Sequence, residues 1–262
     1  MGRALRLVTG RVTNPGTAFT ALTPNSGDRF AVDNFDVSRS AYLVALWAKA
    51  ASPGAVRVRS PRLHDNSQAI RLQNANATPF LLFKPPFGQR LYPSDQLTVE
   101  MTGGTAETDS LGMLWTYEDL PGVDARFADW PSIAGRIRNL VTCEILAPRP
   151  TTAGDYGATR PITDQYDVLK ANTDYALLGY VVSSDVTAVA IQGPDTGNLR
   201  IGGPGHTQQL QTVDYFVNLS EQFGAPYIPI INANNRGATQ VQIVDNATAG
   251  SVAVNLILAE LG

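Results

Sequence analysis

The sequence holds little of the side-chain chemistry that most catalytic sites use. It has one cysteine, Cys143, and two histidines, His64 and His206. A single cysteine excludes an intrachain disulfide, and its position between Val141 and Ile145 favours a small buried hydrophobe over a nucleophile. Both histidines lie in loops near a proline, without the His-x-His spacing of a duplicated metal-binding barrel. We therefore predict that both are solvated loop residues and that the chain has no metal site.

Motifs for nucleophilic and phosphate chemistry are also missing. The sequence contains no Gly-x-Ser-x-Gly elbow and no Gly-x-x-x-x-Gly-Lys loop, and its Gly-rich stretch at 202–205 is interrupted by Pro204. Because catalytic triads assemble from distant positions, a missing motif does not exclude an enzyme. The prediction is that the chain is not an enzyme, with no catalytic residue, no cofactor-binding residue and no cofactor.

Long apolar runs and an excess of basic charge are absent as well. No segment approaches the roughly 18–20 apolar residues that span a bilayer, and residues 1–6 are not followed by the apolar run of a signal peptide. The net charge of −3 and a pI near 5.4 argue against a surface that coats nucleic acid. We expect a soluble product of the cytoplasm.

What the sequence does have is an internal duplication. Short patterns of the first part recur in the same order in the second, with spacings that drift as loop insertions would make them drift. The matches are Leu7-Val8-Thr9 with Leu140-Val141-Thr142, Asp33 to Val37 with Asp164 to Val168, Tyr42 to Trp47 with Tyr175 to Tyr180, Ala55 to Val58 with Ala188 to Ile191, Thr78 to Phe80 with Ala225 to Tyr227, and Ser110 to Tyr117 with Ser251 to Leu258. These ordered matches predict two copies of one domain.

The apolar residues alternate with a period of two, which is typical of half-buried strands. Val56 and Val58 alternate with Arg57 and Arg59. The last strand of each copy has one apolar face, formed by Leu111, Met113, Trp115 and Tyr117 in the first and by Val252, Val254, Leu256 and Leu258 in the second. Each copy offers about eight short antiparallel strands, which favours a jelly roll. An immunoglobulin-like sandwich is the alternative.

The predicted fold is therefore all-β, with two tandem, internally duplicated eight-stranded jelly-roll domains joined by a short helical linker. The domains span residues 1–122 and 136–262. The linker spans 123–135, where apolar residues follow three- and four-residue spacing around Pro131, so that short helices on either side of the proline are expected. A further helical turn is predicted near residues 213–221, in the second copy alone.

Two other features could carry a site. The aspartates of the repeated pattern, Asp33/Asp36 and Asp164/Asp167, could ligate calcium, but a structural role at a turn is favoured. The segment 79–95 is rich in phenylalanine, tyrosine and proline. It could bind a sugar or a peptide, but an apolar loop of this kind favours a surface that a neighbouring subunit covers.

This architecture resembles that of the double jelly-roll major capsid proteins of icosahedral double-stranded DNA viruses, including bacteriophages. The resemblance covers the whole chain and rests on the repeated Leu-Val-Thr, Asp-[Asn/Gln]-[Phe/Tyr]-Asp-Val and last-strand patterns. It implies a structural virion protein, made in the host cytoplasm, that forms homotrimers whose six jelly rolls make a pseudo-hexagonal block. Other capsid proteins would be its partners, without direct contact to nucleic acid. Many such viruses have an internal membrane, but the short ends of this chain offer little for membrane contact.

Charge is distributed unevenly between the copies. Residues 1–122 hold 12 Lys+Arg and 10 Asp+Glu, a net of +2, whereas residues 123–262 hold 8 and 13, a net of −5. In a trimer that alternates unlike copies, these charges would complement each other, and charge reversal at Arg57 and Arg59 is expected to weaken assembly. The alternatives are a viral fibre or carbohydrate-binding β-sandwich module and, third, a duplicated jelly-roll enzyme.

Overall fold

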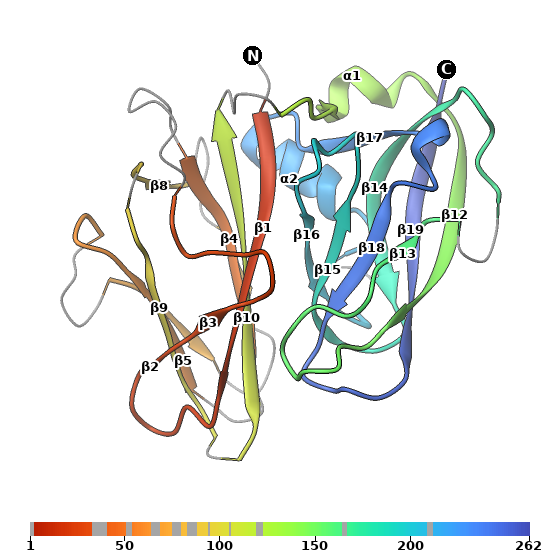
Figure 1. The fold of residues 1–262 in the computed structure, drawn as a ribbon. Helices are drawn as coiled ribbons and strands as arrows, with labels where there is room; N and C mark the ends of the chain where they lie inside the picture. Colours follow the sequence, from red (N-terminus) through yellow and green to blue (C-terminus); the bar gives the residue numbers. More distant parts are fainter. Residues whose placement is uncertain are drawn as a thin grey trace.

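The computed structural model describes residues 3–32, 41–50, 54–63, 69–74, 80–82, 88–93, 95–104, 106–118, 123–163, 167–208 and 212–262. Within these residues the chain is predominantly β, with antiparallel pairing throughout and few, short helices (Figure 1). The all-β prediction is confirmed. The strands of residues 3–118 pair among themselves, and so do those of residues 123–262. We call these two parts the first half and the second half.

The first half has a large sheet and a small sheet. The large sheet has the order β3-β1-β10-β4-β7, with β8 also pairing β4, and the small sheet has the order β2-β9-β5-β6. The large-sheet strands are β1 (Arg3–Thr13), β3 (Thr23–Pro24), β4 (Ala41–Lys49), β7 (Phe80–Leu82), β8 (Gln89–Leu91) and β10 (Thr108–Glu118). The small-sheet strands are β2 (Thr20–Ala21), β5 (Gly54–Arg59), β6 (Ile70–Asn74) and β9 (Thr98–Thr102).

The second half is built in the same way. Its large sheet has the order β11-β17-β14-β19-β12 and its small sheet the order β13-β18-β15-β16. The large-sheet strands are β11 (Phe127–Ala128), β12 (Ile137–Pro148), β14 (Asp174–Val182), β17 (Ile228–Asn232) and β19 (Ser251–Leu261). The small-sheet strands are β13 (Arg160–Pro161), β15 (Val186–Gln192), β16 (Ile201–Gly205) and β18 (Gln240–Val244).

Strand order is shared between the halves. β1-β10-β4-β8 matches β12-β19-β14-β17 in the large sheets, and β2-β9-β5-β6 matches β13-β18-β15-β16 in the small sheets. Each large sheet also has a bulge at the same place, with Val44 the extra residue of β4 and Leu178 the extra residue of β14. Since an extra residue bends a strand and increases its twist, the two large sheets bend at corresponding points.

The bulges fix which residues of the two halves correspond. They place Leu114 of β10 in the position that Ile257 has in β19. Leu7 pairs with Leu114, and Thr142 pairs with Ile257. Leu7 therefore corresponds to Thr142, two residues beyond the position that the sequence match indicated. A shift of two keeps every side chain on its own face, because side chains alternate along a strand.

On the bulged strands the sequence match is wrong by one residue. Trp47 pairs with Gly112, and the corresponding pair in the second half is Val181 with Asn255. Trp47 therefore corresponds to Val181 rather than to Tyr180. A shift of one exchanges the two faces of a strand, so Tyr180, which the sequence match paired with Trp47, lies on the opposite face of its sheet.

Two apolar clusters fill the molecule. One consists of first-half residues alone and includes the predicted inner face of β10, from Leu111 to Tyr117. The other contains the predicted inner face of β19 and, in addition, the bulge residue Val44 and first-half residues from the opposite face of the large sheet: Leu5, Leu7, Ala45, Trp47 and Leu114. The predicted inner faces are thus confirmed, and the outer face of the first large sheet is buried as well.

The helices are short. In α1 (Trp130–Ala134), Asp129 caps the N-terminus by accepting a hydrogen bond from the backbone N–H of Ser132, and Pro131 lies in the first turn, where its missing N–H costs nothing. α1 covers part of the predicted helical segment 123–135, and Phe127–Ala128 before it is a strand that pairs with β17. α2 (Tyr215–Phe223) lies where a helical turn was predicted, and η2 is a single 3-10 turn at Ala233–Asn235.

Candidate functional site: the junction and the two faces it leaves open

The halves meet face to face. Figure 1 shows β1, β10 and β4 of the first large sheet next to β15 and β16 of the second small sheet. Leu5 and Leu7 of β1 are 1% and 0% exposed there, and Ala190 of β15 is 1% exposed. Ala190 pairs with Gly202 of β16. Such small residues let the two sheets approach closely, so this part of the junction is apolar and tightly packed.

Trp47 is the largest side chain in the junction. It is fully buried, and its indole ring lies against Gly112, where any side chain would collide with it. Its Nε1–H donates to the backbone oxygen of Thr187 in the second half at 2.6 Å. The hydroxyls of Thr187 and Ser110 are also 2.6 Å apart. The ring thus contributes apolar burial and satisfies its single polar group across the junction.

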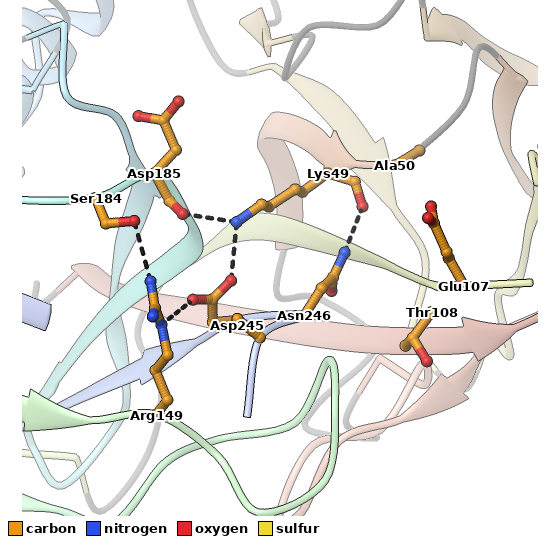
Figure 2. A pocket seen from close by; sticks show the side chains of 10 residues that line it. Lys49, Ala50, Glu107, Thr108, Arg149, Ser184, Asp185, Asp245 and Asn246 are labelled. Atoms are coloured by element: carbon orange, nitrogen blue, oxygen red, sulfur yellow. Dashed lines mark hydrogen bonds and ion pairs between the residues drawn. The ribbon is translucent and has the colours of Figure 1, made fainter. Parts of the chain in front are cut away.

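A buried carboxylate joins the halves beside this tryptophan. Asp245 is 0% exposed and accepts from Lys49 Nζ and from Arg149 Nε, each at 2.8 Å (Figure 2). Lys49 comes from the first half, and it also donates to the backbone oxygen of Asp185 at 2.6 Å. Asn246 donates to the backbone oxygen of Lys49 at 3.2 Å. A buried charge with two cationic partners satisfies the requirement that buried ions be paired.

The cleft around Asp245 has a volume of about 630 Å³ and is lined by both halves. Glu107 and Thr108 stand apart from the ion pairs on its other side (Figure 2). Both of its cations are already engaged by Asp245, and Arg149 also donates to the hydroxyl of Ser184 at 3.0 Å. The arrangement therefore holds the halves together.

A second polar cluster lies beside β1. Asp28 Oδ2 accepts from the backbone N–H and the hydroxyl of Thr9, both at 2.8 Å, and from the hydroxyl of Tyr156 in the second half at 2.9 Å. Burial raises the pKa of Asp28 despite these hydrogen bonds. Arg200 stacks 4.1 Å from the Tyr156 ring, and its backbone oxygen accepts from the N–H of Leu7 at 2.7 Å. This last hydrogen bond satisfies a backbone N–H on the edge of β1 that does not face β10.

The junction joins the outer face of one large sheet to the outer face of one small sheet. The outer faces of the other small sheet and the other large sheet are not part of it. The first large sheet packs on the second small sheet, so the first small sheet and the second large sheet lie at opposite ends of the molecule (Figure 1). The chain therefore presents at its two ends the counterparts of the two faces that it has joined internally.

The outer face of the first small sheet is rich in arginine, and the side chains of Arg57 and Glu100 on it are only 13% and 9% exposed. We call it the arginine face, formed by Phe19, Arg57, Arg59, Arg71 and Glu100. Arg57 lies 4.0 Å and Arg71 5.5 Å from the centre of the Phe19 ring. Glu100 Oε2 accepts from Arg57 at 2.8 Å and from Arg59 at 2.9 Å. Burial alone would raise the pKa of Glu100, but these hydrogen bonds outweigh it and lower the pKa.

The open face of the second large sheet is more apolar. We call it the leucine face, formed by Leu140, Glu144 and Leu146 of β12, Val181 of β14 and Asn255 of β19. Leu140 is 61% exposed and Leu146 is 42% exposed, an unusual exposure for large apolar residues. β12 is also the terminal strand of its sheet, and no strand of the described residues pairs with its outer edge. In the first half, β3 pairs with β1 at that position.

The residues singled out in the sequence are dispersed. Cys143 is buried on the inner side of β12, as predicted, and burial raises its pKa to about 11. Asp167 forms an exposed ion pair with Arg236 at 2.9 Å. Asp33, Asp36, Asp164 and His64 lie outside the described residues.

The prediction for His206 is wrong. Its side chain is only 12% exposed, at the end of β16, with Nδ1 3.9 Å from Asp185. Burial lowers the pKa of His206, the charge of Asp185 opposes this, and Lys49 adds to it. No residue of the described ranges forms a hydrogen bond with its Nε2. The charges of Asp185 and of Lys49 from the first half both act on His206, a neighbourhood that its local sequence did not reveal.

The aromatic segment 79–95 is described only in part. Residues 83–87, with two of its phenylalanines, lie outside the described ranges. Tyr92 is half-buried, and the guanidinium groups of Arg62 and Arg90 lie 5.3 and 5.2 Å from its ring centre. This ring is therefore already engaged by two cations of the same half.

Metal-binding clusters and membrane-spanning helices are both absent from the described residues. Among them, no three or more His, Cys, Asp and Glu residues are grouped so as to hold a metal ion. None of the described helices combines the length and the apolar character that crossing a membrane requires.

Comparisons with known proteins give weak likenesses. No family model and no curated protein matches the sequence. Among solved structures, the chain is similar to the PBSX exported protein XepA, with 11% identity, a TM-score of 0.23, and coverage of 98% of this chain and 86% of that one. It is also similar to AerE from Microcystis aeruginosa, with 6% identity, a TM-score of 0.21 and 98% coverage of both chains.

A third likeness is to the beta-porphyranase BpGH86A of the human gut bacterium Bacteroides plebeius, of glycoside hydrolase family 86. The identity is 10% and the TM-score 0.21, with coverage of 96% of this chain and 38% of that one. TM-scores of this size do not establish a common fold and indicate no shared activity.

Sequence reasoning missed the residues that build the junction. Trp47 and Lys49 both lie on β4 and Asp245 directly follows β18, and no local pattern distinguishes them from ordinary strand residues. One signal was available. β10 has one large apolar residue, Leu114, on the face opposite the predicted inner residues, and a strand buried on both faces must be covered twice.

Proposed function

We propose that the chain is a structural virion protein, a major capsid protein that self-associates as pseudo-hexagonal trimers in an icosahedral shell. The observation that carries the proposal is the repeated strand order. Eight strands divided between two sheets as β1-β10-β4-β8 and β2-β9-β5-β6 follow the order of a jelly roll, and the second half repeats it. We therefore propose two tandem jelly-roll domains, residues 1–122 and 136–262, joined by residues 123–135.

The open faces support self-association. A chain that presents two different faces at opposite ends can associate head to tail, and such contacts close into a ring when the rotation per copy allows it. Three copies would bring six similar sandwiches around one axis. We propose the virion as the location, and other capsid proteins as further partners.

Arg57 and Arg59, at which charge reversal was expected to weaken assembly, also form ion pairs within their own half. Arg57 and Arg59 both bind Glu100 within their own sheet. Reversing their charge would break these internal ion pairs as well as any contact with a neighbour. Arg71, which is exposed and makes no such pair with Glu100, is therefore the better position at which to test the charge of this face.

Sedimentation velocity and negative-stain electron microscopy of the purified full chain test the proposal. We expect a species of three copies with a hexagonal outline, and shells or sheets of such blocks at higher concentration. A chain that stays monomeric at every concentration would contradict the proposal. If that monomer bound defined sugars on a glycan array, the fibre or carbohydrate-binding alternative would replace it.

A further inference from the structure

We propose that the leucine face of one copy binds the arginine face of a second copy, head to tail, in the arrangement that the two halves already adopt within one chain. The inference rests on the proposed self-association and assigns the surfaces that make it. Its partner is therefore a second copy of this chain.

The internal junction is the template. The first large sheet contributes Leu5, Leu7 and Trp47 to the junction. By strand pairing these residues correspond to Leu140, Thr142 and Val181, and Leu140 and Val181 belong to the leucine face. In the first half the outer face of the large sheet is buried by the second small sheet, whereas in the second half the corresponding face is exposed.

The opposing surface follows the same correspondence. In the junction, Ala190 pairs with Gly202 and Gln242 on neighbouring strands. Its sequence match in the first half, Arg57, pairs with Arg71 and Glu100, which belong to the arginine face. The leucine face thus corresponds to the first-half face of the junction, and the arginine face corresponds to the second-half face of the junction.

The internal junction and the proposed contact between copies place their large side chains on opposite sheets. The large side chain is on the large sheet in the junction and on the small sheet in the contact between copies. The internal junction places a large ring, Trp47, on one sheet and small residues, Ala190 and Gly202, on the other. In the contact between copies, the corresponding positions hold the smaller Val181 on one side and the long Arg57 and Arg71 on the other. Large meets small in both cases, which is what close packing between sheets requires.

The chemistry of the two faces also fits. Arginine stems cover apolar surface while their guanidinium groups reach polar partners. The leucine face offers apolar area at Leu140 and Leu146, with Glu144 and the Asn255 amide between them, whereas the arginine face has three arginines and a single carboxylate. Opposite charge at the contact favours this pairing over contact between two arginine faces.

The open edge of β12 adds a backbone contact. The N–H of Leu7 donates to the backbone oxygen of Arg200 across the junction. Thr142 corresponds to Leu7. Arg200 directly precedes β16, and Ala69 directly precedes β6. Because β16 corresponds to β6, Arg200 corresponds to Ala69. The contact between copies should therefore place Thr142 of one copy beside Ala69 of the next.

Cysteine cross-linking tests this position. Because Cys143 is buried, Thr142→Cys and Ala69→Cys each introduce one accessible thiol. We expect a mixture of the two variants to form a disulfide-linked dimer under mild oxidation, since adjacent backbones meet the roughly 4.4–6.8 Å Cα separation that a disulfide needs. Each variant alone should form no such dimer, because in a head-to-tail contact like positions do not meet.

A matched pair of exposed apolar residues supplies the second test. Leu146 is 42% exposed on the leucine face, and Val168 is 43% exposed outside it. Leu146→Lys places a cation against the arginine face and should weaken self-association at least about tenfold in sedimentation velocity, the equivalent of one buried leucine. Val168→Lys should leave self-association unchanged.

The outcomes separate this inference from the proposed function. If the wild-type chain self-associates but neither the mixed cross-link nor the effect of Leu146→Lys is found, the assigned faces are wrong and self-association stands. If Thr142→Cys links to itself, the contact joins like faces and the head-to-tail inference is overturned. If the wild-type chain is monomeric, both proposals are overturned.

Discussion

The two halves share a strand order but differ in what lies over their large sheets. In the first half, β1 is flanked by β3 and covered by the second half, so that Leu5 is 1% exposed. In the second half, β12 is an edge strand, and the corresponding Leu140 is 61% exposed. Topology, bulge position and inner faces are alike, whereas the outer faces differ in both composition and burial.

The inner and outer faces of the two halves are therefore under separate constraints. Inner faces pack within one half and tolerate only apolar residues of suitable volume. Outer faces are determined by what each sheet meets, so Trp47 can stand in one half where Val181 stands in the other. Substitutions at corresponding positions can therefore measure how far the environments of the halves have diverged.

The largest effect is expected at Trp47. Trp47→Ala removes a fully buried ring and leaves the Thr187 carbonyl without its donor, and it should lower the free energy of unfolding by about 3–5 kcal/mol. Val181→Ala, at the corresponding half-buried position, should cost less than about 1.5 kcal/mol. Urea unfolding of both variants measures the contrast, and equal losses would show that the correspondence is wrong.

Asp245→Asn should have the next largest effect. It removes a buried charge that two cations share, and the loss should be about 3 kcal/mol because Lys49 and Arg149 lose their counter-ion. The matched control is Asp167→Asn, whose carboxylate is 58% exposed in its pair with Arg236 and should cost less than about 1 kcal/mol. Chemical denaturation at neutral pH compares the two.

Two corresponding leucines, Leu5 and Leu140, differ in burial and should differ in their contribution to stability. Leu5→Ala should lower the free energy of unfolding by at least about 2 kcal/mol, because the side chain is buried in the junction. Leu140→Ala should change it by no more than about 0.5 kcal/mol in the monomer, because most of that side chain is already in water. A large loss for Leu140→Ala at low protein concentration would contradict the open face.

The smallest effect concerns pH. Burial holds the pKa of His206 below its ordinary value. As pH falls through about 6.5, the unfolded chain binds a proton at this residue before the folded chain does, so stability falls with falling pH. His206→Gln removes this linkage and should make the loss of stability between neutral and mildly acidic pH smaller. An unchanged pH dependence would show that His206 titrates alike in both states.

Much of the fold could be predicted from the sequence, because its signals are local. Alternation of period two located β5, β10 and β19, and the repeated patterns indicated two related halves. Exact correspondence could not be read in this way. The bulges at Val44 and Leu178 each insert a residue that matching the two sequences does not detect. Trp47 therefore corresponds to Val181, one residue after Tyr180.

The junction was beyond prediction for a different reason. Its contacts join Trp47 to Thr187 and Lys49 to Asp245, residues far apart in the chain whose meeting depends on how the two halves dock. His206 was misjudged for the same reason, since the burial of its side chain beside Asp185 depends on contacts distant in the sequence. The outer faces, where we place the proposed contact between copies, carry no motif at all.

The bulges described above also constrain how this chain can change in length. Side chains alternate along a strand, so deleting Val44 or Leu178 would turn over every residue on one side of the deletion and present core residues to water. Surface loops face no such rule, because an added loop residue costs little. Insertions and deletions that the fold tolerates should therefore be found in the connections, with β4 and β14 keeping a fixed residue count.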